Sequence, residues 1–66
     1  MQIILNGQPL DCVAGSTLAA LLAETGHAQR RMAVEVNHEI VPRSEQCRRV
    51  LAAGDRVEII HAVGGG

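Results

Sequence analysis

Apolar and polar residues alternate along residues 32–36, in the pattern of a strand that is buried on one face. Met32, Val34 and Val36 fall on one side of such a strand, and Glu35 falls on the other. The alternation predicts a half-buried strand, and therefore a sheet with one face turned toward a core.

Residues 56–61 show a second strand pattern, which follows a turn signal at Gly54-Asp55. Val57 and Ile59 share one face of this strand, whereas Ile60 falls on the opposite face. Because no second helix is predicted to cover that opposite face, we expect Ile60 to contribute to an exposed apolar patch that docks a partner. A cover of loops is the alternative.

The N-terminal segment predicts a β-hairpin. Residues 1–5 are rich in strand-forming side chains, and Asn6-Gly7 tolerates the positive φ angles of a two-residue type I′ turn. A second strand is expected to begin near Gln8. It must be short and lie at an edge, because Pro9 has no N–H to donate to a neighbouring strand.

Leucines at a helical spacing follow the hairpin. Leu18, Leu21 and Leu22 recur at i, i+3 and i+4, which places them on one stripe of a helix. Ser16 is the expected N-cap, and Gly26 is expected to end the helix in the left-handed conformation. We therefore predict one helix with a single apolar stripe.

The region between the last two predicted strands has a weaker pattern. Residues 40–41 predict a short extended piece that ends at Pro42. After it, Cys47, Val50 and Leu51 are spaced to line one side of a brief helix or 3₁₀ turn.

Together these elements predict an α+β fold. Their order is strand, strand, helix, strand, irregular segment, strand, and one helix across one face of a mixed sheet buries a single leucine stripe in few residues. Hairpin pairing and a right-handed crossover favour the ubiquitin-like β-grasp, with a sheet of four to five strands. We assign residues 1–63 to this domain and residues 64–66 to a flexible glycine-rich tail.

Composition narrows the range of functions. The 66 residues allow one small domain without a roomy active site. A formal net charge of -1 and the absence of Phe, Trp and Tyr argue against nucleic acid, which needs a basic field and stacking aromatics. The apolar runs predict neither a membrane span nor a signal peptide, so we expect a cytoplasmic protein. We take it to be a monomer when free. Cys12 and Cys47 lack CxxC spacing, and we expect free thiols.

Candidate chemistry within the domain is sparse. His27, His38 and His61 have no metal-ligand spacing, so no metal site is expected. The acidic residues are scattered and no nucleophile is paired with a base, so we expect no catalysis by this chain alone. Arg30-Arg31 and Arg48-Arg49 are expected to be solvated, with docking of acidic partner surfaces as the functional alternative.

The C-terminal residues carry the strongest functional signal. Gly64, Gly65 and Gly66 follow Val63, and a glycine run can pass extended through a narrow channel. Residues 63–66 reach about 13 Å at about 3.3 Å per residue, enough to enter a partner's active site. We expect the tail to deliver the α-carboxylate of Gly66. An ionised carboxylate is a poor electrophile, so a separate enzyme must activate it, as an acyl-adenylate made from ATP.

Several short motifs occur in order along nearly the whole chain. They are Asn6-Gly7, Gly-Ser-Thr-Leu at 15–18, Val36-Asn37, Ile-Val-Pro-Arg at 40–43, Gly-Asp-Arg-Val-Glu at 54–58 and the terminal glycines. Each motif is weak alone, but the set resembles the ThiS family of β-grasp sulfur carriers in thiamine biosynthesis.

The resemblance implies that the chain is a substrate and carrier. An E1-like adenylyltransferase would activate the C-terminal glycine, here Gly66, with ATP. Sulfur from a cysteine desulfurase persulfide would convert the acyl-adenylate to a thiocarboxylate, and thiazole synthase would take that sulfur into the thiazole ring. Gly64 and Gly65 would form the flexible approach, although the family's motif needs two terminal glycines and this chain has three. No cofactor is expected to bind the chain itself.

Two alternatives remain open. The small subunit of molybdopterin synthase is a β-grasp carrier with the same thiocarboxylate chemistry; the short chain, the absence of aromatics and Val-Pro-Arg at 41–43 argue against it. The other alternative is a ubiquitin-like tag or a binding module, in which the tail forms an amide with a target lysine or has no chemistry.

Overall fold

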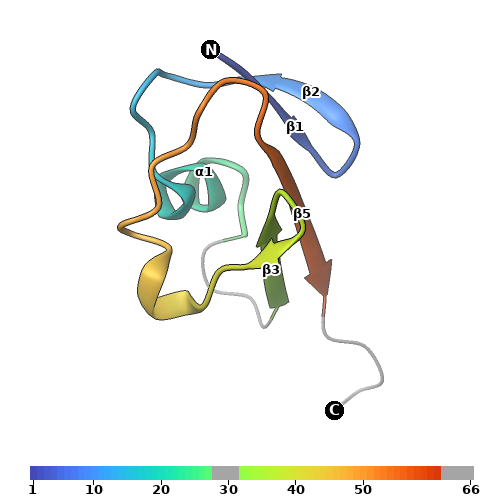
Figure 1. Cartoon of the computed structure of the whole chain (residues 1–66), viewed down its shortest axis with the longest axis vertical. Helices are drawn as coiled ribbons and strands as arrows, with labels where there is room; N and C mark the ends of the chain where they lie inside the picture. The colour runs from blue at the N-terminus through green and yellow to red at the C-terminus, as the bar shows by residue number, and fades with distance from the viewer. Residues whose placement is uncertain (28–31, 62–66) are drawn as a thin grey trace.

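The computed structural model describes residues 1–27 and 32–61 (Figure 1). The predicted tail, with Val63 and the three terminal glycines, lies outside these residues. The elements in chain order are β1 (Gln2–Leu5), β2 (Gln8–Asp11), α1 (Leu18–Glu24), β3 (Met32–Val36), β4 (Glu39–Ile40), the 3₁₀ helix η1 (Arg43–Glu45) and β5 (Arg56–His61).

The strands form one mixed sheet in the order β2-β1-β5-β3-β4. Strand β1 is antiparallel to β2 and parallel to β5, and β3 is antiparallel to both β5 and β4. Helix α1 and η1 lie on one side of this sheet (Figure 1). One helix on a mixed five-stranded sheet confirms the predicted α+β class. Residues 1–27 and 32–61 contain no candidate for a membrane-spanning helix.

The N-terminal hairpin forms as predicted. Asn6 and Gly7 have φ angles of 49° and 81°, the signs that a type I′ turn requires, and Leu5 pairs with Gln8 across the turn. Pro9 lies in β2, at the edge of the sheet, where its missing N–H costs no bond to a neighbour.

Helix α1 begins one residue later than predicted. Its N-cap is Thr17, whose Oγ1 accepts a hydrogen bond from the backbone N–H of Ala20 at 3.2 Å. The prediction of Ser16 was wrong because the Ser16 hydroxyl instead donates to the carbonyl of Val13 at 2.6 Å, which closes the preceding turn.

The end of α1 follows the prediction. Gly26 has a φ of 82°, and its N–H donates to the carbonyl of Ala23. The N–H of His27 donates to the carbonyl of Leu22 at 2.7 Å. This pair of bonds is a Schellman motif, which satisfies carbonyls that the last turn of a helix leaves free.

The core lies between α1 and the inner face of the sheet. The predicted leucine stripe of α1 and the predicted inward residues of β3 and β5 are buried together. The buried residues are Ile3, Leu18, Leu21, Leu22, Val34, Val36, Val41, Leu51, Val57 and Ile59. Full burial of an aliphatic side chain of this size contributes about 1.5–3 kcal/mol, so this single layer is the main source of stability.

The segment between β4 and β5 differs from the prediction. The 3₁₀ helix covers Arg43–Glu45, before the predicted stretch, and of the three predicted residues Leu51 is buried while Cys47 and Val50 are exposed. The reason is a pairing distant in sequence: Val50 forms an antiparallel bridge with Thr17. Extended backbone there turns Val50 outward and Leu51 inward.

Candidate functional site

Strand β5 is the root from which the predicted tail continues, and it lies at the centre of the sheet. It pairs with β3 over five residue pairs, from Val36↔Val57 to Met32↔His61. On its other side it pairs with β1 at two positions, Ile4↔Arg56 and Leu5↔Val57. The last part of β5 is therefore fixed firmly along one edge by β3, and no described strand pairs with its other edge beyond Val57.

Two asparagine side chains complete the anchoring of β5. Asn6 Oδ1 accepts a hydrogen bond from the N–H of Ile59 at 2.8 Å, which continues the β1–β5 ladder beyond the end of β1. Asn37 Oδ1 accepts from the N–H of Arg56 at 3.0 Å, and Asn37 Nδ2 donates to Asp55 Oδ1 at 3.0 Å. These bonds fix both the start and the middle of the strand.

The outer face of the sheet, the face turned away from α1, carries exposed apolar residues. Ile60 is 49% exposed, while its neighbour Ile59 on the inner face is 8% exposed. This confirms the predicted orientation of Ile60, and no loop within residues 1–27 and 32–61 covers it. Ile60 pairs with the exposed Ala33 of β3. Ile40 of β4 is the cross-strand partner of Glu35, so it lies on the outer face as well, and it is 67% exposed.

Charged residues lie between these two isoleucines. Glu35 of β3 is the direct cross-strand partner of Glu58 of β5. His38, in the turn between β3 and β4, places a ring nitrogen close to both carboxylates, with the three donor atoms within 4.8 Å of one another. The spacing of the histidines along the sequence gave no sign of this cluster.

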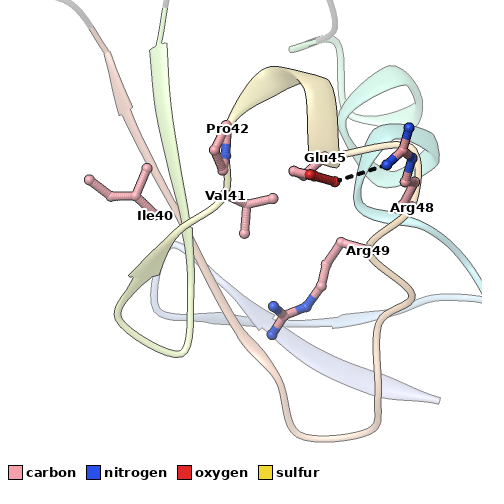
Figure 2. A pocket seen from close by; sticks show the side chains of 6 residues that line it. All are labelled: Ile40, Val41, Pro42, Glu45, Arg48 and Arg49. Carbon is pink, nitrogen blue, oxygen red and sulfur yellow. Dashed lines mark ion pairs between the residues drawn. The ribbon is translucent and has the colours of Figure 1, made fainter.

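A groove lies next to η1, on the side of the molecule that carries Arg48-Arg49 (Figure 2). Its volume is about 300 Å³, and its lining comprises Ile40, Val41, Pro42, Glu45, Arg48 and Arg49. Arg48 Nη1 lies 3.7 Å from Glu45 Oε2, whereas no ion pair of Arg49 forms among residues 1–27 and 32–61. Arg48 is thus engaged in an ion pair, whereas the guanidinium of Arg49 is available next to the apolar residues that line the groove.

The other predicted residues are placed as follows. His27 Nδ1 lies 2.9 Å from the hydroxyl of Thr25, within hydrogen-bond distance. Cys12 is half-buried, Cys47 is exposed, and both are free thiols. Arg30-Arg31 and the tail residues lie outside the described part of the chain.

Comparisons with known proteins agree with this architecture. The model of the ThiS family matches residues 3–66. Sulfur carrier protein ThiS of Escherichia coli (strain K12) is 33% identical over 66 residues, which cover all of both chains. The crystal structure of a thiamine biosynthesis protein (ThiS) from Geobacter metallireducens superposes with a TM-score of 0.84 at 30% identity and covers both chains completely.

A longer relative adds a second kind of similarity. Thiazole synthase of Paramagnetospirillum magneticum is 41% identical over 66 residues, which are all of this chain but 20% of that protein. The chain therefore spans about a fifth of the length of this curated relative. Because a family model covers nearly every residue and a full-length relative exceeds 30% identity, the chain belongs to the ThiS family of sulfur carriers with the β-grasp fold.

Proposed function

We propose that this chain carries sulfur for the synthesis of the thiazole ring of thiamine, with the α-carboxylate of Gly66 as the group that is loaded. The observation that carries the proposal is the match of the ThiS family along residues 3–66, which includes the terminal glycines. The structure adds a physical support: β5, which leads to the tail, is held by five residue pairs with β3 and by the side chain of Asn6. A rigid root and a narrow glycine run are suited to insertion into a partner's active site.

The proposed loading takes place in three steps on partner enzymes. A carboxylate oxygen of Gly66 attacks the α-phosphorus of ATP, pyrophosphate leaves, and an acyl-adenylate forms. The terminal sulfur of a persulfide, supplied by a cysteine desulfurase, then attacks the acyl carbon and AMP leaves. A thiolate then attacks the cysteine sulfur of the remaining sulfur–sulfur bond and forms a disulfide with that cysteine, and the thiocarboxylate of Gly66 leaves.

We assign the adenylation to an E1-like adenylyltransferase and not to this chain. The described residues include no phosphate-binding loop that could cradle ATP. The Thr25 hydroxyl, which lies 2.9 Å from His27 Nδ1, donates to the carbonyl of Leu21 at the end of α1 and so serves the helix terminus. ATP is thus a reactant of the partner and not a cofactor of the carrier. The availability of ATP also makes the cytoplasm the expected site of action.

Thiazole synthase is the proposed acceptor of the sulfur. The support is the thiazole synthase of Paramagnetospirillum magneticum, in which a segment similar to this whole chain occupies 20% of the protein. Two segments that share one chain in a relative are candidates for direct contact when they are on separate chains. A thiocarboxylate sulfur is softer and more nucleophilic than a carboxylate oxygen, which suits attack on a carbonyl or imine.

The proposed docking surface is the outer face around Ile60, next to the root of the tail. Ile60 is half exposed on a central strand and pairs with the exposed Ala33, so the two side chains form an apolar surface that a partner can cover. Val63, Gly64 and Gly65 would then lie in the channel that leads to the reacting carboxylate. Arg49 in the groove of Figure 2, which forms no ion pair within the described part of the chain, offers a cation to an acidic partner residue, and this would steer encounter more than add affinity.

Intact-mass spectrometry tests the proposal. The chain is incubated with ATP, a ThiS-family adenylyltransferase, a cysteine desulfurase, cysteine and a thiol. We expect the mass to rise by the difference between one sulfur and one oxygen atom. A chain without Gly65 and Gly66 should keep its mass, and a chain with Gly64 deleted is the matched control that retains the two glycines of the family motif.

The same experiment separates the alternatives. Adducts of much higher mass would favour a protein tag, and an unchanged mass would favour a binding module. To distinguish the two carriers, the thiocarboxylate form is offered to thiazole synthase and to the large subunit of molybdopterin synthase. Sulfur transfer to the latter alone would overturn the assignment to thiazole formation.

A further inference from the structure

We propose that Glu35, His38 and Glu58 form a binding site for a divalent transition-metal ion of the zinc class on the outer face of the sheet. The site is separate from the chemistry of the tail, and it does not depend on the proposed function. Each residue offers one donor atom, an imidazole nitrogen or a carboxylate oxygen, and the three atoms lie within 4.8 Å of one another.

The backbone brings the three donors together and holds them there. Glu35 and Glu58 face each other in the middle of the five-pair register between β3 and β5. His38 is in the two-residue turn that joins β3 to β4, where Val36 pairs with Glu39. Because the paired strands and the tight turn already fix the backbone of all three residues, binding an ion orders only their side chains and no backbone, which favours binding.

The local electrostatics also favour a cation at this position. Two carboxylates that are direct cross-strand partners repel each other, and this arrangement destabilises a sheet. Among residues 1–27 and 32–61, the side chains of Glu35, Glu58 and His38 form neither ion pairs nor hydrogen bonds with other residues. A bound dication would replace the repulsion between Glu35 and Glu58 by two attractive contacts.

The donor set and its dimensions suit zinc better than magnesium or calcium. Zinc binds imidazole nitrogen and carboxylate oxygen at about 2.0–2.2 Å in tetrahedral geometry, so two donors on one ion are about 3.5 Å apart. The observed limit of 4.8 Å closes to that value by small rotations of side chains. Magnesium and calcium prefer oxygen ligands alone and a higher coordination number.

The site leaves room for a further ligand. Three protein donors occupy three of the four positions of tetrahedral zinc. A hollow of about 330 Å³, lined in part by Arg56 and Glu58, adjoins the cluster on the outer face. A water molecule or a partner's side chain can therefore complete the coordination.

The test uses the full-length chain without an affinity tag, titrated with zinc chloride and, separately, with magnesium chloride. Heteronuclear NMR should show a saturable one-to-one change confined to the amides of residues 35–39 and 58. The Tm should rise by about 10 °C or more when free zinc exceeds the Kd a hundredfold. Magnesium at the same concentration should leave both observables unchanged.

Two variants remove one donor each without unfolding the chain. Glu58→Gln removes the like-charge pair, so its metal-free Tm should equal or exceed that of the wild type, while its zinc affinity should fall at least about tenfold. His38→Gly removes the imidazole at a φ of 69°, which glycine adopts without strain, so the fold should persist and the response to zinc should be lost.

Two matched controls should keep the response. Glu39→Gln changes a carboxylate next to His38 that is outside the cluster, and Cys47→Ser removes the exposed thiol, a competing zinc ligand. The proposal is overturned if zinc causes no saturable change, if Glu58→Gln and His38→Gly bind zinc as the wild type does, or if Cys47→Ser abolishes binding.

Discussion

Ile59 and Ile60 are the same residue at adjacent positions of β5, yet they belong to different surfaces. Ile59 is 8% exposed and packs in the core under α1, whereas Ile60 is 49% exposed on the outer face. The comparison extends to the whole sheet: the inner face holds the buried aliphatic residues, and the outer face holds the exposed isoleucines and the Glu35–Glu58 pair. The residues that build the fold and those available for recognition therefore alternate along the same strands.

This alternation limits how the chain can change. A shift of one residue in the register of β5 would exchange the two faces, exposing Val57 and Ile59 and burying Glu58. The bonds from Asn6 to Ile59 and from Asn37 to Arg56 fix this register from both sides of the strand. Stability and presentation of the outer face thus depend on the same few polar contacts.

The largest expected effect is loss of the buried isoleucine. Ile59→Ala should lower the free energy of unfolding by about 2–5 kcal/mol, because it leaves a cavity against α1. A domain of this size has about 3–5 kcal/mol in total, so much of the Ile59→Ala protein should be unfolded. Urea denaturation followed by circular dichroism measures both proteins, with Ile59→Val, at about 0.5–1.5 kcal/mol, as the milder variant.

The adjacent substitution is the matched control. Ile60→Ala should change the free energy of unfolding by less than about 0.5 kcal/mol. Equal losses for Ile59→Ala and Ile60→Ala would contradict the distinction between the two faces.

The second effect concerns the anchoring of β5. Asn6→Gly keeps the positive φ of the turn but removes the acceptor for the N–H of Ile59, and should cost about 1–3 kcal/mol. Amide hydrogen exchange should accelerate at Ile59 more than at Ile3 of the core. If exchange at Ile59 stayed as in the wild type, the hydrogen bond would have no role in holding the strand.

A smaller effect distinguishes the two candidate caps of α1. Thr17→Ala should cost about 1 kcal/mol, because the N–H of Ala20 loses its acceptor. Ser16→Ala should cost less, about 0.5 kcal/mol, because its hydroxyl bonds to an exposed turn. Thermal unfolding of both variants tests the order, and a larger loss for Ser16→Ala would restore Ser16 as the main stabilising residue at this end.

The smallest effect on stability, and the sharpest on recognition, is expected for Ile60→Asp. The free energy of unfolding should change by less than about 0.5 kcal/mol, since the side chain faces solvent. The KM for adenylation should rise about tenfold, which corresponds to about 1.4 kcal/mol of lost contact, with kcat unchanged. An unchanged KM would remove Ile60 from the docking surface, and Val13→Asp, at another exposed apolar site, controls for added charge.

Local physics explains which parts of the fold could be predicted from the sequence. The Asn6-Gly7 turn, the leucine stripe of α1 and the alternation of Ile59 and Ile60 depend on residues that are neighbours in sequence, and all three were predicted correctly. The fold class followed because these local elements leave few ways to bury one stripe of leucines.

The features that were missed depend on residues far apart in sequence. Val50 is extended because it bridges to Thr17, so the spacing of Cys47, Val50 and Leu51 misled. Asn6 binds a backbone group 53 residues away, and Glu35 meets Glu58 through strand register alone. Such contacts leave no local pattern in a single sequence, because they form only when distant strands pair.

The most direct test of the central claim locates the transferred sulfur atom. Tandem mass spectrometry of the loaded chain should place sulfur in the C-terminal fragment, in place of an oxygen of the Gly66 carboxylate. A Cys12→Ser/Cys47→Ser double variant should be loaded to the same extent, because neither thiol takes part. Sulfur found instead as a persulfide on Cys47, and lost in the double variant, would contradict the account.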